Sequence, residues 1–159
     1  MKMSKPLYLS NNFIDWGMKD DVPITQLKLQ KLLYLYYARY CHVLDLKPFD
    51  DCFVKWPYGP VLISVYEKTK QFGDDALLLL QDADRQTYKM ALSKKEAREI
   101  FNDVIQRYGK YSASELVKLT HDGPKGMNHQ TAWKKAPQMG GFLLAADIKE
   151  DGRIFFDGN

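Results

Sequence analysis

The 159-residue sequence has little of what would fix a disulfide framework, a metal or a membrane anchor. It contains only two cysteines, Cys41 and Cys52, too few for the framework of a small secreted domain and not spaced like a metal knuckle. We expect both thiols to be reduced. No stretch approaches the roughly 18 apolar residues that a membrane span needs, and the N-terminus lacks the pattern of a signal peptide. These absences predict a soluble, cytoplasmic protein that does not bind membranes.

The sequence also lacks the motifs of the common enzyme classes. There is no GxGxxG or GxxxxGK[ST] loop, no GxSxG elbow and no HExxH pair. Covalent catalysis would need Cys41 or Cys52 beside a base. His42 follows Cys41 directly, and adjacent residues on a helix do not face each other. We therefore expect no catalytic residue, no enzymatic activity and no cofactor.

The charge balance is too even to require a nucleic-acid partner. The chain has 23 basic and 20 acidic residues and a net charge of +3. Positive charge is nevertheless enriched between residues 105 and 137, where Tyr111 and Trp133 lie among five lysines. Lysines can hold phosphates and aromatic rings can stack on bases, so a nucleic-acid-binding regulator using this basic C-terminal face is an alternative function. The five lysines are Lys110, Lys118, Lys125, Lys134 and Lys135.

A metal-dependent hydrolase is a third hypothesis. His121, Asp122 and His129 lie in one loop-rich region, and histidine and aspartate are common metal ligands. Their spacing matches no recognised metal site, however. We therefore expect no bound metal, and we expect His121 instead to form a hydrogen bond near the C-terminus of a helix, where a cation is favoured.

Length and composition predict one domain over residues 1–159. Apolar residues make up 45% of the chain and charged residues 27%, which is ordinary for a globular protein with a full hydrophobic core. Apolar residues recur at helical spacing from Ser4 to Asp20 and again from Thr25 to Val43. The second stretch is apolar on nearly all sides, which predicts a central buried helix. The expected fold is mainly α (α+β), a compact helical domain around this helix with a small two- or three-stranded β element.

The β element is predicted at Phe53–Trp56, where β-prone residues precede a proline. A helix is then predicted from Pro60 to Phe72, because proline suits the first helical position, with Gly59 as its cap. Residues 87–92 and 153–156 are candidates for further short strands, and the first of these for pairing with Phe53–Trp56.

Two stretches have the Ser-x-x-Glu pattern of a capping box, Ser93–Glu96 and Ser112–Glu115. Each precedes apolar residues at helical spacing, so each predicts the start of a helix. Near the C-terminus, Asp151-Gly152 has the composition of a turn.

Two sequence motifs carry a resemblance to a known family. LKLQKLLY at residues 27–34 is followed by KWPYGPV at 55–61, and then by Val65 and Tyr66. With Leu-Thr-His at 119–121, this arrangement closely resembles the SocA-like antitoxin family, also known as the Panacea antitoxin domain, many of whose members are called phage-associated proteins. The resemblance is strongest over residues 7–136.

The resemblance implies a mostly helical domain that binds and neutralises a cognate toxin encoded beside it, in a bacterial or phage toxin–antitoxin system. It implies no catalytic residues. We expect the motif residues to act mainly as structural residues. They are Leu29, Lys31, Leu32, Leu33, Tyr34, Trp56, Tyr58, Gly59, Pro60, Val61, Tyr66, Thr120 and His121.

Helical spacing suggests where a partner could bind. Lys31, Tyr34 and Tyr37 are three residues apart and share a helix face. This face is offset from the apolar stripe that we assign to the core, which is formed by Leu29, Leu33, Tyr36 and Tyr40. Tyrosines beside a basic residue suit a protein interface. The hypothesis is that Lys31, Tyr34, Tyr58 and Tyr66 border one groove that binds the toxin. The alternative is that these tyrosines close the core with their hydroxyls at its rim. The sequence gives no oligomeric state and no identity for the toxin.

Overall fold

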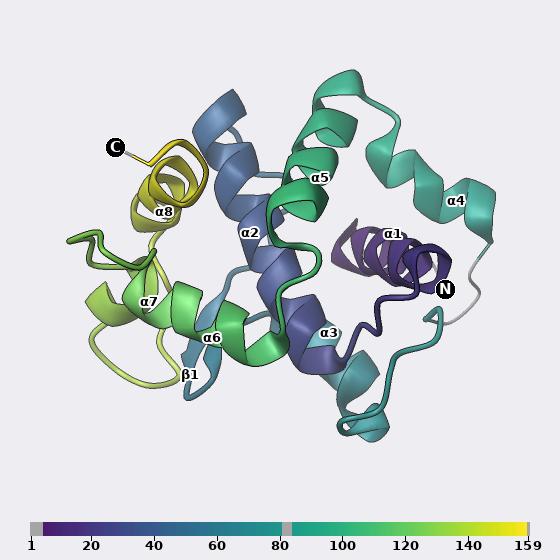
Figure 1. The fold of residues 1–159 in the computed structure, drawn as a ribbon, viewed down its shortest axis with the longest axis horizontal. Coiled ribbons are helices and arrows are strands. Elements are labelled where there is room, and N and C mark those ends of the chain that lie inside the picture. The colour runs from purple at the N-terminus through teal and green to yellow at the C-terminus, as the bar shows by residue number, and fades with distance from the viewer. Residues whose placement is uncertain (1–4, 81–83, 159) are drawn as a thin grey trace.

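A long helix, α2 (Gln26–Leu44), lies in the middle of the molecule (Figure 1). The computed structural model describes residues 5–80 and 84–158. The Thr25 hydroxyl caps α2 by accepting a hydrogen bond from the Lys28 amide at 3.3 Å, and Asp45 ends it in the left-handed conformation. Twelve of its residues are buried, because other helices pack around it. The prediction of a central buried helix is confirmed.

The other long helices are α1, α5 and α8, and α2 packs against all three. Their bounds are α1 (Lys5–Asp20), α5 (Lys95–Tyr108) and α8 (Ala145–Asp157). The shorter helices are α3 (Ile63–Thr69), α4 (Arg85–Lys89), α6 (Ala113–Asp122) and α7 (Ala132–Lys135), with 3₁₀ turns η1 (Lys70–Phe72) and η2 (Met90–Leu92). The mainly α fold class is confirmed. Within residues 5–80 and 84–158, no helix is both long enough and apolar enough to span a membrane.

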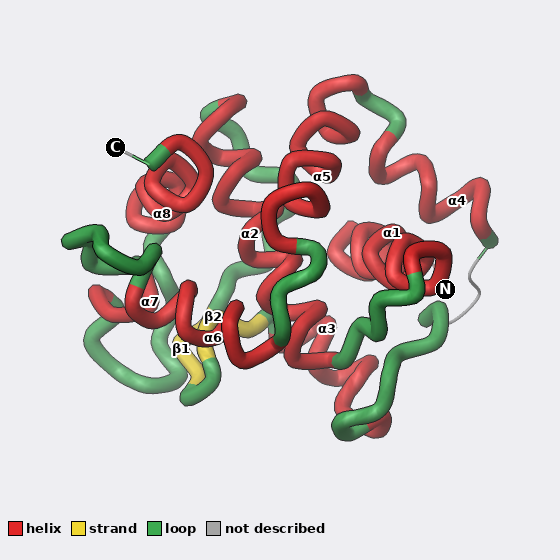
Figure 2. Tube along the Cα trace, in the orientation of Figure 1, coloured by secondary structure: helices red, strands yellow, loops and turns green. Residues whose placement is uncertain are grey.

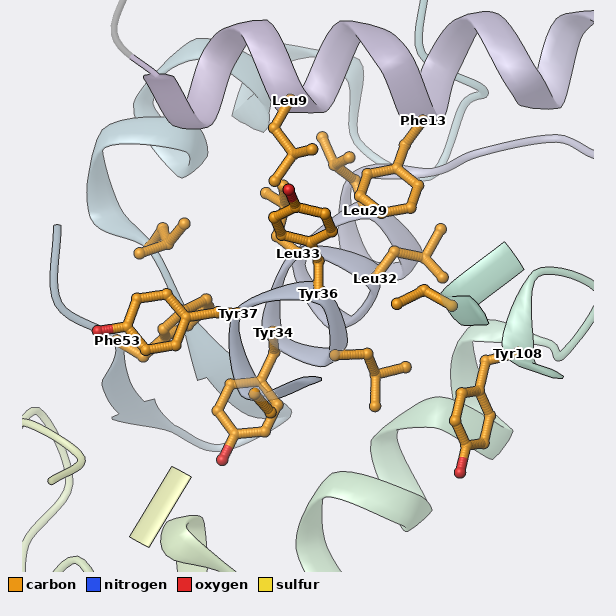
Figure 3. Packing of buried hydrophobic residues seen from close by; sticks show 14 of the residues in the cluster. Leu9, Phe13, Leu29, Leu32, Leu33, Tyr34, Tyr36, Tyr37, Phe53 and Tyr108 are labelled. Carbon is orange, nitrogen blue, oxygen red and sulfur yellow. The ribbon is translucent and has the colours of Figure 1, made fainter. Parts of the chain in front are cut away.

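The core is rich in aromatic side chains that α2 directs to several sides (Figure 3). The ring of Tyr34 meets that of Phe53 edge-on, with centroids 5.1 Å apart, and Tyr37 meets Phe53 in the same way. On the opposite side of the helix, Phe13 of α1 packs against Phe101 of α5. Such aromatic pairs add to the stability that burial alone provides.

Helices α2 and α8 approach each other closely because α8 contains a glycine at the contact. A Cβ atom on Gly152 would lie 2.0 Å from the carbonyl oxygen of Ala38. The expected turn at Asp151-Gly152 is wrong, since both residues lie inside α8. The candidate strand at 153–156 is also wrong. These residues belong to α8, and Ile154, Phe155 and Phe156 are buried side chains of that helix.

The β element is a small antiparallel hairpin at the lower edge of the view, beside α6 (Figure 2). Its strands are β1 (Val54–Trp56) and β2 (Gly59–Val61), with Val54 opposite Val61. The strand predicted at Phe53–Trp56 is therefore confirmed. Residues 87–92 do not pair with it; they form α4 and η2.

The helix after the hairpin starts later than the sequence predicted. Gly59 and Pro60 belong to β2, and α3 begins at Ile63. Gln30 of α2 explains the difference, because its side-chain amide bonds both the amide and the carbonyl of Leu62, at 2.9 and 3.1 Å. This double hydrogen bond holds the chain extended up to Leu62.

Only one of the two predicted capping boxes forms. Ser112 and Glu115 make the reciprocal hydrogen bonds at the start of α6. At α5 the N-cap residue is Lys94, which makes no side-chain capping hydrogen bond, so the Ser93–Glu96 box is wrong. Ser4, the candidate N-cap of α1, lies outside the described residues.

Candidate functional site

The motif residues from three distant parts of the sequence meet beneath the hairpin. Lys31 of α2 is fully buried, and its Nζ donates a hydrogen bond to the Pro60 carbonyl at 3.0 Å. Gly59 has a φ of 112°, and a Cβ there would lie 2.6 Å from Lys31 Cε and 3.0 Å from Thr120 Oγ1. Glycine is therefore required for both its conformation and the close packing.

Burial sets the electrostatics of this cluster. Removal from water lowers the pKa of Lys31 to about 7, because the ammonium form loses its hydration. Burial, together with the charge of Lys31, also lowers the pKa of His121. Both basic groups of the cluster therefore hold their protons less tightly than they would in water.

His121 lies in the last turn of α6, as predicted, but its ring packs rather than bonding. It stacks on Trp133 with ring centroids 3.8 Å apart and an angle of 13° between planes. Its buried Nε2 has no hydrogen-bond partner among the described residues. Trp133 in turn donates from Nε1 to the Trp56 carbonyl at 2.8 Å, which ties α7 to the hairpin.

A second buried cluster centres on Asp151 of α8. The Tyr34 hydroxyl donates to its carboxylate at 2.6 Å, and His129 Nε2 lies 2.7 Å from the other oxygen. The amide of Ala132 also points at both oxygens. Asp151 is fully buried, and burial raises its pKa against the effect of these partners. Tyr34 and Asp151 are 117 residues apart, so no local pattern could have identified this pair.

The residues of the hydrolase hypothesis do not converge. His121 stacks on Trp133, His129 bonds Asp151, and Asp122 pairs with lysines of α6 and α7. Within the described ranges no group of three potential ligands could hold a metal. Both cysteines are free, and burial raises the pKa of Cys41 to about 11, which disfavours its thiolate.

The structure separates the four residues of the groove hypothesis. Lys31 and Tyr34 are fully buried, so the expectation that they border an open groove is wrong. Their helix face is covered by β2 on one side and α8 on the other. Tyr58 is 68% exposed at the tip of the hairpin, and Tyr66 is partly buried against Trp56. A partner-binding role for Tyr58 and Tyr66 stays a prediction.

A residue that the sequence did not point to extends this exposed region. Phe142, 65% exposed, forms an antiparallel bridge with Val54 of β1. The bonds of this bridge are made by its neighbours, from the Leu143 amide to the Phe53 carbonyl and from the Lys55 amide to the Gly141 carbonyl. In such a pair the amide and carbonyl of Phe142 itself point away from β1.

We call Trp56, Tyr58, Tyr66 and Phe142 the hairpin surface. Trp56 and Tyr66 meet edge-on with ring centroids 4.8 Å apart. Val54 and Phe142 are cross-strand partners, so their side chains lie on the same face of the sheet. The surface thus combines aromatic side chains with a short open strand edge at Phe142.

Three of the five lysines of the basic C-terminal face contact acidic neighbours. Lys118 and Lys134 both contact Asp122, and Lys135 contacts Asp147. Nucleic-acid binding depends on lysines that are free to contact phosphates. The structure therefore does not favour the regulator hypothesis.

Comparison with known proteins agrees with the motifs. A family model described as "Antitoxin SocA-like, Panacea domain" matches residues 29–125, more than half of the chain. The chain is 28% identical over 123 residues to Antitoxin SocA of Caulobacter vibrioides (strain NA1000 / CB15N). That match covers 71% of this chain but 63% of the relative, so the chain spans less than two thirds of the relative's length. No solved structure matches significantly. The chain belongs to the SocA-like antitoxin family, defined by its Panacea domain.

Proposed function

We propose that this chain is an antitoxin that neutralises a cognate toxin protein by binding it through the hairpin surface. The role is that of a protein-binding module, without catalysis by this chain. The observation that carries the proposal is the exposure of Tyr58 and Phe142, 68% and 65%, on the hairpin and on the segment bridged to its strand β1; Trp56 of the same hairpin contacts Tyr66. Family membership supports the antitoxin role.

The chemistry of these residues fits a protein partner. Tyrosine, tryptophan and phenylalanine are enriched at protein interfaces, where they often supply most of the binding energy. The outward amide and carbonyl of Phe142 offer main-chain hydrogen bonds to an extended segment of the partner. Trp56, Tyr58 and Tyr66 lie within the region that the family model matches, and Phe142 lies beyond its end.

The hairpin is also held rigidly, which lowers the cost of binding. Lys31 bonds the carbonyl of Pro60 from below, and Gln30 bonds Leu62 where β2 ends. Trp133 bonds the carbonyl of Trp56 from the side. In this view the buried motif residues do not touch the toxin; they fix the backbone that presents the aromatic side chains.

The test begins with the gene adjacent to the one encoding this chain. Its product is expressed under an inducible promoter, with and without this chain, and cell growth is measured. We expect the neighbour to stop growth and this chain to restore it. A double variant, Tyr58→Ala with Phe142→Ala, should keep the melting temperature of the wild type and lose the rescue.

The matched control is Leu78→Ala, which removes a side chain of similar exposure, 63%, elsewhere on the molecule. It should rescue growth like the wild type. A neighbour that is harmless in the absence of this chain would contradict the antitoxin role. Full rescue by the folded double variant would leave the antitoxin role standing and would refute the hairpin surface as the contact.

A further inference from the structure

A second feature of the surface is a cleft of about 500 Å³ between α1, α2, the loop after α2, and the segment that runs from α4 into α5. Its apolar lining includes Leu9, Phe49 and Met90, and among the residues that the structure describes no acidic side chain lines it. A volume of roughly 300 to 1,000 Å³ is typical of sites for small molecules. None of the hairpin-surface residues lines the cleft, so it is a separate site.

The polar side chains that line the cleft carry hydroxyl or ammonium groups. Lys5 and Lys94 are exposed at its edge, and neither forms an ion pair with another described residue. Ser93 lies beside Lys94, and its hydroxyl is not used in a capping box. The first turn of α5 borders the cleft through Ala97; it contains Glu96 but has no side-chain capping bond from Lys94, and a helix N-terminus favours negative charge.

Tyr36 gives the strongest indication of a ligand. Its side chain is 97% buried, since only 3% is exposed, yet it lines the cleft. No residue within the described ranges forms a hydrogen bond with its hydroxyl. Figure 3 shows the ring directed from α2 toward Leu9 of α1. Burial raises the pKa of Tyr36, so the hydroxyl remains a neutral donor at physiological pH. The hydroxyl oxygen is not one of the buried side-chain atoms that lack a partner, so it is accessible from the cleft and available to a ligand there.

We propose that this cleft binds a small organic carboxylate with an apolar body. The carboxylate accepts a hydrogen bond from the Tyr36 hydroxyl and lies in the positive field of Lys5 and Lys94. The apolar body packs on Leu9 and Phe49. The proposal does not depend on the antitoxin role, because it rests on a different part of the molecule.

Isothermal titration calorimetry with two defined probes, decanoate and 1-naphthaleneacetate, tests the proposal on the full chain. We expect saturable binding of at least one of them, and binding of the matching uncharged alcohol that is several-fold weaker. Tyr36→Phe keeps the ring and removes the donor, so affinity should fall about tenfold, as expected for a hydrogen bond to a charged group. Ala91→Trp places a large ring in the cleft and should abolish binding.

A pair of charge reversals separates local from general electrostatics. Lys94→Glu should weaken carboxylate binding, whereas Lys125→Glu makes the same change in net charge at an exposed lysine outside the cleft and should not. Melting temperatures confirm that each variant is folded. The proposal is overturned if neither carboxylate binds saturably, if the alcohol binds as tightly as the acid, or if folded Tyr36→Phe and Ala91→Trp bind like the wild type.

Discussion

Substituting Lys31 should change how the stability of the fold depends on pH. Lys31 is fully buried, with one hydrogen bond to the Pro60 carbonyl, and its pKa falls from 10.5 to about 7. Below pH 7 the side chain is protonated in both the folded and the unfolded chain, so it adds no pH dependence. Between pH 7 and 10.5 the unfolded chain binds the extra proton, and stability therefore rises with pH.

The size of the effect follows from the separation of the two pKa values. At about 1.4 kcal/mol per pH unit, the full interval corresponds to roughly 5 kcal/mol, of which about 3 kcal/mol lies between pH 7 and 9.5. Lys31→Met keeps a side chain of similar length without the charge, so it removes the contribution of Lys31 to the pH dependence of the free energy of unfolding. The free energy of unfolding of the wild type, minus that of Lys31→Met, should grow by about 3 kcal/mol across that range.

Urea unfolding at half-unit steps from pH 6 to pH 9.5 measures this difference. The upper limit avoids the titration of the tyrosines near pH 10, and effects of other groups cancel because both proteins contain them. Lys68→Met, which removes an exposed ammonium on α3, is the control and should follow the wild type. Parallel profiles for wild type and Lys31→Met would refute a neutral buried lysine beneath the hairpin.

Four further substitutions test the packing around α2 and the helix starts. Tyr34→Phe removes a donor to the buried Asp151 carboxylate and should lower the free energy of unfolding by about 1.5 to 3 kcal/mol; an unchanged urea midpoint would argue against that bond. Gly152→Ala forces a methyl group against the backbone of α2 and should cost more than about 1 kcal/mol, which a wild-type melting temperature would contradict. Ser112→Ala should cost about 1 kcal/mol because it removes a capping box, whereas Ser93→Ala should stay within about 0.5 kcal/mol; equal losses in thermal melts would mean that both boxes form.

Short sequence patterns correctly predicted the elements that are stabilised by interactions between residues close together in the sequence. The α2 helix follows from apolar spacing and from Thr25, which caps it by bonding a residue three positions later. The Ser112 capping box likewise involves residues three apart. β1 was predicted from β-prone residues before a proline, and the two motifs were sufficient to indicate the family. Each of these features depends on interactions within a few residues.

The errors arose where a distant partner changes what a local pattern means. Gly59 and Pro60 have the composition of a helix start, but Gln30 and Lys31 bond the backbone around them and keep it extended. Asp151-Gly152 has the composition of a turn, but the glycine is needed where α8 contacts α2. A pattern in one segment does not report the segment that packs on it.

In the candidate site, too, some features follow from short sequence segments and others only from the tertiary structure. The sequence by itself determined the central helix, the hairpin strand and the family, because periodicity, capping and a dense motif are properties of short segments. Only the tertiary structure decided which motif residues face solvent: it buried Lys31 and Tyr34 and left Tyr58 exposed. It also brought Phe142 beside β1. Exposure depends on every element that packs around a side chain, and spacing along one helix cannot specify those neighbours.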